Sequence, residues 1–388
     1  MTSLAIQRLR APRLDWVLLG ATAGLLSIGC LLVWSASRHA PAEGLVQHHL
    51  LNVVIGVMLL VTALVTDHRY LRLLTPVVYA GSLVGLALVL VMGSTINGSR
   101  SWVRIAGMSI QPAEFAKLAV IVTMALVVAE RVERSGRVRR VGTREVVLLL
   151  AVAALPAALI MLQPDLGTML VLSAAVLGAL AVSGAPGRWL AALVGAGVMA
   201  SIAVVALGVL KPYQIDRFLA FTNPALDPRG AGYNTTQARI AIGNGGIFGQ
   251  GLFHGSQTRA GFVPEQHTDF VFTVAGEEFG LLGAGVVVLL LGLVVWRALV
   301  IALRATDMFG RVAAAGIATW IGFQAFQNIG MCLGIMPVTG VPLPLVSYGG
   351  SSIFATMLAI GLLHNIHLRG GRIVAASVVP TRRDLVSS

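Results

Sequence analysis

The sequence is poor in charge. Only 11% of its 388 residues are Asp, Glu, Lys or Arg, whereas soluble globular chains have about 25%. Hydrophobic residues make up 56%, which excludes a water-soluble globular domain. Because one membrane-spanning helix takes roughly 20 apolar residues, about ten spans would use most of this apolar content. We therefore expect residues 1–388 to form a single transmembrane domain.

Cysteine and acidic residues are also scarce. The two cysteines, Cys30 and Cys332, lie in or beside apolar runs, where a disulfide framework is not expected. The chain has 16 acidic residues against 28 Lys and Arg, a formal net charge of +12. In a soluble protein this excess would suggest nucleic acid as a partner, but membrane proteins collect Lys and Arg in their cytoplasmic loops. We expect a membrane, and no nucleic acid, to explain the charge.

Long apolar runs are what the sequence has in abundance. Each run is about twice as long as a barrel strand and apolar on every face, whereas barrel strands alternate in polarity. The fold class is therefore predicted to be an all-α polytopic membrane protein with about ten transmembrane helices. The runs lie near residues 16–36, 46–66, 73–92, 113–130, 146–162, 167–183, 188–210, 270–295, 312–333 and 349–367.

The basic residues predict the orientation. Of the 28 Lys and Arg residues, 19 lie in segments that face the cytoplasm if the N-terminus does, as the positive-inside rule requires. Both termini are then cytoplasmic, with a C-terminal tail at 369–388. A long extracytoplasmic loop, 211–268, lies between helices 7 and 8. The unusual polar residues face outward, in this loop and in the loops 93–112 and 334–348.

An ion pair is predicted at the start of the fourth helix. Lys117 lies about one turn inside an apolar run, where a cation costs roughly 2.5–3.5 kcal/mol on insertion scales. Glu114 is three residues earlier and on the same helix face, so the pair can neutralise itself and mark a substrate path. Alternatively, Pro112 is the first helical residue and Glu114 only returns to the backbone in a capping box.

Two further outer segments allow a structural and a functional interpretation. Asp165, in the turn between helices 5 and 6, is either a helix cap or a site residue. The glycines of residues 243–251 either let backbone N–H groups approach an anion or only form tight turns. Their spacing is not GxGxxG and no strand precedes them, so a dinucleotide-binding fold is rejected.

A carboxylate stands at the beginning of the eighth helix. Asp269 follows Glu265 and His267, and partial burial would raise its pKa toward that of a general base. Alternatively, Thr268 or Asp269 is simply the N-cap of the helix. No group of His, Asp and Cys has metal-ligand spacing.

The segment around Ser347 contains three prolines and a Gly-Gly step before a helix. Its rigid backbone could present N–H groups to an anion. Alternatively, the segment is only an ordinary helix start.

Five segments together resemble the SEDS family of bacterial membrane glycosyltransferases, of the RodA/FtsW type, over nearly the whole chain. They are the Trp102 loop with QPAEFAK, then QPDLGT, IAIGNGGIFGQG, PEQHTDFVF with GEEFG, and GVPLPLVSYGGSS. The resemblance implies a polymerase of lipid II, the undecaprenyl-diphosphate-linked disaccharide pentapeptide, in the bacterial cytoplasmic membrane. It also implies a class B penicillin-binding protein as partner.

The resemblance makes Asp269 the catalytic residue. The predicted substrate-binding residues are Trp102, Glu114, Lys117, Asp165, Arg100, Arg104, Arg239, His267 and Ser347. Two positions depart from the family pattern, because Ser101 and Gln250 stand where many members have a basic residue. The three arginines among the predicted residues could supply the missing phosphate contacts.

Charge considerations give a mechanism. The acceptor hydroxyl must lose a proton as it attacks the anomeric carbon, so one base, Asp269, is required. The leaving lipid diphosphate is already a stable anion and needs positive charge rather than an acid. Lys117, the arginines or a divalent cation, Mg²⁺ or Mn²⁺, could supply that charge, and no other cofactor is expected. Direct displacement would invert the α-linked donor to a β-linkage.

Two other classes of function stay open. A flippase or transporter for lipid-linked precursors would also place polar residues in spans, but it would need charges in both leaflets. A structural scaffold explains the topology but neither Lys117 nor Asp269. Within the polymerase class, the short termini favour cell-wall elongation over the septal, FtsW-type role or a sporulation role.

Overall fold

The computed structural model describes residues 14–38, 44–96, 99–105, 108–135, 141–208 and 230–376. Within these residues, each of the ten predicted spans is a helix, which confirms the fold class. The ten helices are α1 (Trp16–Ser37), α2 (Leu45–Val65), α3 (His68–Met92), α4 (Pro112–Ser135), α5 (Thr143–Leu162), α6 (Leu166–Val182), α7 (Gly187–Ala206), α11 (Val271–Arg304), α12 (Met308–Leu333) and α13 (Gly350–Ala376).

Several helices continue past the boundaries that the apolar runs predicted. Helix α11 runs to Arg304, so most of the predicted turn 296–311 is helical, and α13 continues to Ala376 inside the predicted tail 369–388. Apolar periodicity marks only the lipid-immersed part of a helix, whereas Arg and Ala favour helix beyond it. The remainder of the tail, 377–388, lies outside the described residues.

The outer loops contain short elements that the sequence did not predict. The loop 93–112 forms a small antiparallel sheet of β1 (Ser94–Ile96), β2 (Ser99–Ile105) and β3 (Met108–Ile110), in the order β1-β2-β3. The long loop contains α9 (Ala231–Asn244) and α10 (Ser256–Ala260). Its first part, 211–229, lies outside the described residues. These elements are too short to produce a long apolar run.

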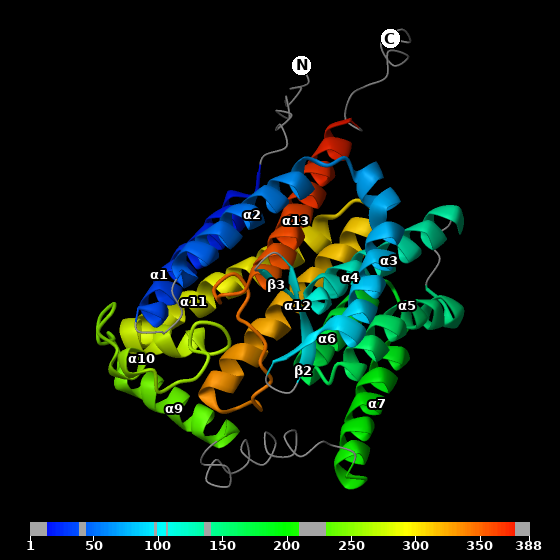
Figure 1. Ribbon diagram of the computed structural model, residues 1–388. Helices are drawn as coiled ribbons and strands as arrows, with labels where there is room; N and C mark the ends of the chain where they lie inside the picture. Colours follow the sequence, from blue (N-terminus) through cyan, green and yellow to red (C-terminus); the bar gives the residue numbers. More distant parts are fainter. Residues whose placement is uncertain are drawn as a thin grey trace, which may run out of the picture.

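Helix α12 lies at the centre of the bundle. It packs against α4, α6 and α11, while α2 packs against α13 and α1 against α11. Figure 1 shows α12, in orange, between α11 and the helices α4 and α6. Helix α7 is peripheral: it contacts α6 and leaves most of its residues exposed. The polar groups of α12 are therefore placed where several elements meet.

The outward-facing surface of the bundle is suited to lipid. Seven of the described helices are long and apolar enough to cross a membrane, and α6 and α7 are apolar but shorter. Large apolar side chains such as Leu73, Val77 and Val91 of α3 are mostly exposed. A bilayer accepts such surface, and helices satisfy their own backbone hydrogen bonds within it. The chain is a multi-pass membrane protein.

Described parts of the first and last segments that are predicted to face the cytoplasm lie at one end of the molecule (Figure 1). The beginning of α1 and the end of α13 lie together, opposite to α9 and α10 (Figure 1). Two ion pairs lie at the end that carries the beginning of α1. Asp15 Oδ2 is 2.5 Å from Arg297 Nη2, and Asp67 Oδ1 is 3.3 Å from Arg369 Nη2. The opposite end carries the sheet, α9, α10 and the loop 334–348.

The glycine-rich segment holds a kink in α11. Gly280 has φ +65° and ψ −164°, a conformation that only glycine adopts readily. Four backbone hydrogen bonds join residues 246–251 to residues 277–282 across this kink. A Cβ added to Gly249 would lie 2.1 Å from a backbone oxygen of α11. These contacts use the N–H groups of Gln250 and Gly251, so the structural interpretation of the glycines is favoured over anion binding.

Candidate functional site

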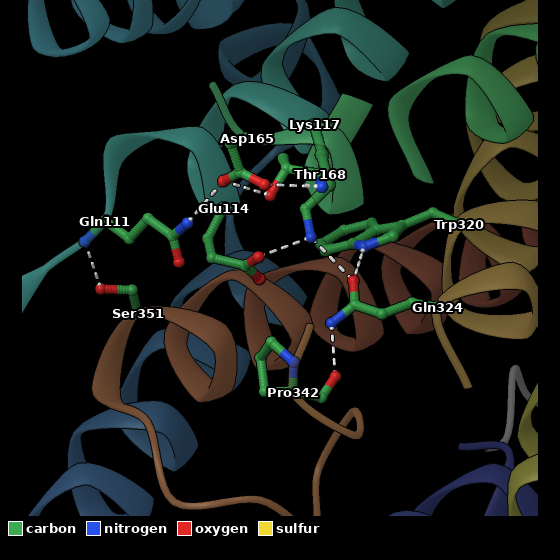
Figure 2. A network of polar contacts seen from close by, with 9 residues as sticks. All are labelled: Gln111, Glu114, Lys117, Asp165, Thr168, Trp320, Gln324, Pro342 and Ser351. Carbon is green, nitrogen blue, oxygen red and sulfur yellow. Dashed lines mark hydrogen bonds and ion pairs between the residues drawn. The ribbon is translucent and has the colours of Figure 1, made fainter. Parts of the chain in front are cut away.

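A buried polar network lies below the outer loops, and Figure 2 shows its members. Lys117 of α4 is fully buried, and its Nζ lies 2.6 Å from Glu114 Oε1. The same Nζ donates to Gln324 Oε1 of α12 at 2.7 Å and lies 5.0 Å from the centre of the Trp320 ring. The predicted ion pair is confirmed, and its cation is further neutralised by an amide oxygen and an aromatic face.

The capping interpretation of Glu114 is wrong. Pro112 is the first residue of α4, as predicted, but Glu114 Oε1 binds Lys117 instead of the backbone. The N–H of Gln111 donates to Ser351 Oγ of α13 at 2.8 Å. The beginning of α4 is therefore tied to the beginning of α13, and the Glu114 carboxylate is left to serve the lysine.

Asp165 is both a helix cap and a member of the network. Its Oδ1 accepts the N–H of Thr168 at 2.9 Å, so it caps α6. Its Oδ2 accepts from Thr168 Oγ1 at 2.8 Å and from Gln111 Nε2 at 3.1 Å. Burial raises the pKa of Asp165, although the hydrogen bonds from Thr168 and the charge of Lys117 act in the opposite direction.

Three amides of α12 join this network to the loop 334–348. Gln324 Oε1 accepts from both Lys117 and Trp320 Nε1, and its Nε2 donates to the carbonyl of Pro342 at 2.9 Å. Gln327 and Asn328 follow on the same helix face and are also fully buried. The sequence analysis missed them. Three amides at positions i, i+3 and i+4 of an otherwise apolar span were the signal that could have revealed them.

Asp269 lies two residues before the first residue of α11 and is half-buried. The N-cap residue of α11 is Phe270, whose side chain makes no cap hydrogen bond, so the interpretation of Thr268 or Asp269 as the N-cap is wrong. The Asp269 carbonyl accepts from Asn328 Nδ2 at 2.7 Å. Its carboxylate faces the outer loop, because a Cβ added to Gly340 would lie 3.3 Å from Asp269 Oδ2.

His267 and Ser347 lie in the same region. The rings of His267 and Tyr348 are 5.6 Å apart, and the Tyr348 N–H donates to the His267 carbonyl at 2.9 Å. Burial lowers the pKa of His267, and the charge of Glu265 acts against that shift. Ser347 is buried, and its hydroxyl accepts the N–H of Leu343 at 2.8 Å. The Ser347 hydroxyl thus helps to shape its own loop.

The remaining predicted residues lie on the outer elements. Trp102 is in β2, opposite Ser94, and is partly exposed. Arg100 and Arg104 are also in β2, and their side chains lie outside the described part of the structure. Arg239 of α9 is exposed, and its Cδ lies 3.2 Å from a Cβ added to Gly334 at the end of α12. Arg239 and Asp269 therefore both lie near the outer end of α12.

The donor set for a metal is poor. Among the described residues, no group of three or more His, Cys, Asp and Glu side chains could hold a metal ion. The predicted divalent cation thus has no ready protein site in this part of the chain.

The family model of the FtsW, RodA and SpoVE cell cycle proteins matches residues 14–370. The chain belongs to this family. MrdB of Escherichia coli K12, a peptidoglycan glycosyltransferase, is 36% identical over 357 residues, which are 91% of this chain and 93% of MrdB. The probable peptidoglycan glycosyltransferase FtsW of Trichlorobacter lovleyi is 36% identical, with 92% and 94% covered. The stage V sporulation protein E of Bacillus subtilis is 35% identical, with 91% and 96% covered.

Solved structures give the same assignment. A chain from a peptidoglycan synthase complex that coordinates polymerization and crosslinking is similar with a TM-score of 0.77 and 32% identity, over 92% of this chain and 98% of that chain. RodA of Thermus thermophilus is similar with a TM-score of 0.67 and 30% identity, over 91% and 96%. The family expected from the motifs is therefore confirmed.

Proposed function

We propose that this protein polymerises lipid II into glycan strands at the outer face of the bacterial cytoplasmic membrane, with Asp269 as the general base. The class of activity, peptidoglycan glycosyl transfer, is that of its relatives MrdB and FtsW. The observation that carries the proposal is the placement of Asp269. Asp269 is half-buried and is not the N-cap residue of α11, and its carboxylate faces the outer loop at Gly340.

Asp269 suits the proton transfer that the reaction needs. The hydroxyl of the acceptor sugar becomes a strong nucleophile only as its proton leaves, and a carboxylate within hydrogen-bond reach takes that proton. Burial beside the loop excludes part of the solvent around Asp269, which strengthens its electrostatic interactions. One displacement at the anomeric carbon then gives inversion.

The leaving diphosphate needs a cation. Lys117 is fully buried, and its ammonium already binds Glu114 and Gln324, so its role is to organise the network beneath the site. Arg239 is exposed beside the end of α12, and its guanidinium makes no hydrogen bond or ion pair with the described residues. We therefore assign the diphosphate contact first to Arg239. A role for Arg100 and Arg104 stays a prediction.

The orientation and the partner are part of the proposal. We place the end that carries Asp15 and Arg297 in the cytoplasm, with both termini, because most basic residues of the sequence belong to the segments predicted to be cytoplasmic. The similar synthase complex coordinates polymerization with crosslinking, which supports a class B penicillin-binding protein as partner.

The elongation role stays a prediction. MrdB, FtsW and the sporulation protein are 36%, 36% and 35% identical to this chain, so the comparisons do not separate the three duties.

Purified protein in lipid vesicles, with and without a class B penicillin-binding protein, would be incubated with lipid II and the products resolved on gels. We expect glycan strands, with a higher yield when the partner is present. Transfer of lipid II between leaflets without any strands would favour a flippase, and neither activity would favour a scaffold. Either result would contradict the proposal.

A further inference from the structure

One side chain of α12 forms hydrogen bonds to two backbone segments of the candidate site. Asn328 is fully buried, and its Nδ2 donates to the carbonyl of Asp269 and to the carbonyl of Val341, both at 2.7 Å. An amide nitrogen carries two hydrogens, so each carbonyl receives one. The contacts also fix the orientation of the amide, because the opposite one would place Oδ1 against two carbonyl oxygens.

The two carbonyls belong to the two backbone segments beside the Asp269 carboxylate, namely the segment of Asp269 itself and the outer loop at Val341. Val341 directly follows Gly340, the residue whose added Cβ would lie 3.3 Å from Asp269 Oδ2. Gly340 has φ +69°, a conformation that favours glycine, and the absence of a side chain leaves room in front of the carboxylate. The position of Gly340 relative to Asp269 therefore depends on the amide that binds both segments.

We infer that Asn328 is a positioning residue for Asp269: its amide fixes the backbone of Asp269 relative to Gly340 and Val341, and so sets the space in which the acceptor hydroxyl meets the carboxylate. The inference rests on the proposed role of Asp269 as base. Asn328 itself touches neither substrate nor proton. A misplacement of about 1 Å at a reacting group can lower a rate about 10²-fold, which is why a backbone contact matters here.

The neighbouring amide provides a matched control. Gln327 is also fully buried, and its Nε2 donates to Thr339 Oγ1 at 2.8 Å. It binds the same outer loop as Asn328 but makes no hydrogen bond to Asp269. A variant at Gln327 therefore removes a loop contact alone, whereas a variant at Asn328 removes a loop contact and the contact to Asp269.

The experiment compares Asn328→Leu with Gln327→Met, each close in shape to the residue it replaces. Polymerisation of lipid II by the full chain with its partner gives kcat, KM and the pH profile of kcat. We expect Asn328→Leu to lower kcat at least about 10-fold with KM nearly unchanged, and to move the acidic limb of the profile, since the environment of the base changes. Gln327→Met should leave the acidic limb of the pH profile in place. Its kcat should stay within about 3-fold of the wild-type value, which is a small loss of transition-state stabilisation.

The pH profile separates positioning from a general loss of structure. The titratable and charged groups of this region are His267 and Glu265 on the segment of Asp269, Tyr348 in the outer loop, Cys332 on α12 and Arg239 of α9, and every variant retains them. Equal losses of kcat with an unchanged acidic limb in both variants would overturn the inference.

Asn328→Ser covers the case in which Asn328→Leu does not fold. It removes both hydrogen bonds without adding apolar bulk, and normal kcat with a normal acidic limb in this variant would overturn the inference too. Asp269→Asn is measured in parallel. If Asp269→Asn polymerises normally, the proposed base is wrong. If it is inactive while Asn328→Leu and Asn328→Ser behave as wild type, only the role of Asn328 is wrong.

Discussion

Burying the ammonium of Lys117 costs free energy, and the residues around it explain how this buried charge is tolerated. Its ammonium is bound by one carboxylate and one amide oxygen and lies over an aromatic ring. Breaking a buried pair costs more than the pair contributes, because a charge is left without compensation. The pair is therefore expected to be sensitive to single replacements.

Glu114→Ala and Lys117→Ala should each lower the free energy of unfolding by about 3–5 kcal/mol, the usual cost of stranding one buried charge. The double variant should lose less than either single variant, because no charge is stranded. Thermal unfolding in detergent and the yield of folded protein measure this, and polymerisation should fall in all three. Normal yield and full polymerisation in both single variants would show that the pair has no role.

His267 predicts a pH dependence of stability. Burial lowers its pKa in the folded protein, so below its ordinary value of about 6.5 the unfolded chain binds more protons than the folded one. Stability should therefore fall as the pH decreases from 7 toward 5. His267→Gln removes this contribution and should show a smaller decrease in Tm between pH 7 and pH 5 than wild type. An equal or larger decrease would contradict the burial of a neutral imidazole.

Local spacing predicted some site residues well and others not at all. The Glu114–Lys117 pair was predicted because both residues lie on one helix face, three positions apart. The contacts of Gln324 and Asn328 were not, because they depend on how α12 packs against the outer loop. The capping alternatives failed for separate reasons: the Glu114 carboxylate binds Lys117, and α11 begins one residue too late for Asp269 to be its N-cap.

At the scale of the element, the kink of α11 is the feature that joins the glycine-rich segment to the membrane helices. The ten long helices could be predicted, because hydrophobicity alone places a span. The kink could not, since it depends on backbone contacts between residues 246–251 and 277–282. The short α9, α10 and the sheet were missed because they contain no span-length apolar run.

Gly280→Ala should destabilise the protein strongly. The positive φ costs an L-residue about 1–3 kcal/mol, and the new Cβ would lie 2.3 Å from the backbone nitrogen of Gly249. Gly285→Ala in the same helix is the matched control, since nothing lies within 4 Å of its added Cβ. Folded yield and Tm of the two variants should differ clearly. Similar values would mean that the kink is not needed.

At the scale of the whole molecule, the orientation in the membrane decides whether the site can reach its substrate. The sequence predicts that 131–145 is cytoplasmic and 211–268 is outside. Single cysteines in place of Arg137 and Arg229, in a chain without Cys30 and Cys332, would be treated with an impermeant thiol reagent in intact cells. Residue 229 should be labelled and residue 137 should not. The reverse pattern would overturn the orientation.

The direct test of the account is the effect of Asp269→Asn on the polymerisation of lipid II by purified protein with its partner. Asparagine keeps the size of the side chain, and Asp269 is not the N-cap residue of α11, so expression, membrane insertion and partner binding should stay normal. Strand formation should fall by the roughly 10²–10⁴-fold assigned to general-base catalysis. Glu265→Gln, which removes an exposed carboxylate from the same segment, should remain active. A strand yield from Asp269→Asn comparable to wild type would contradict the account.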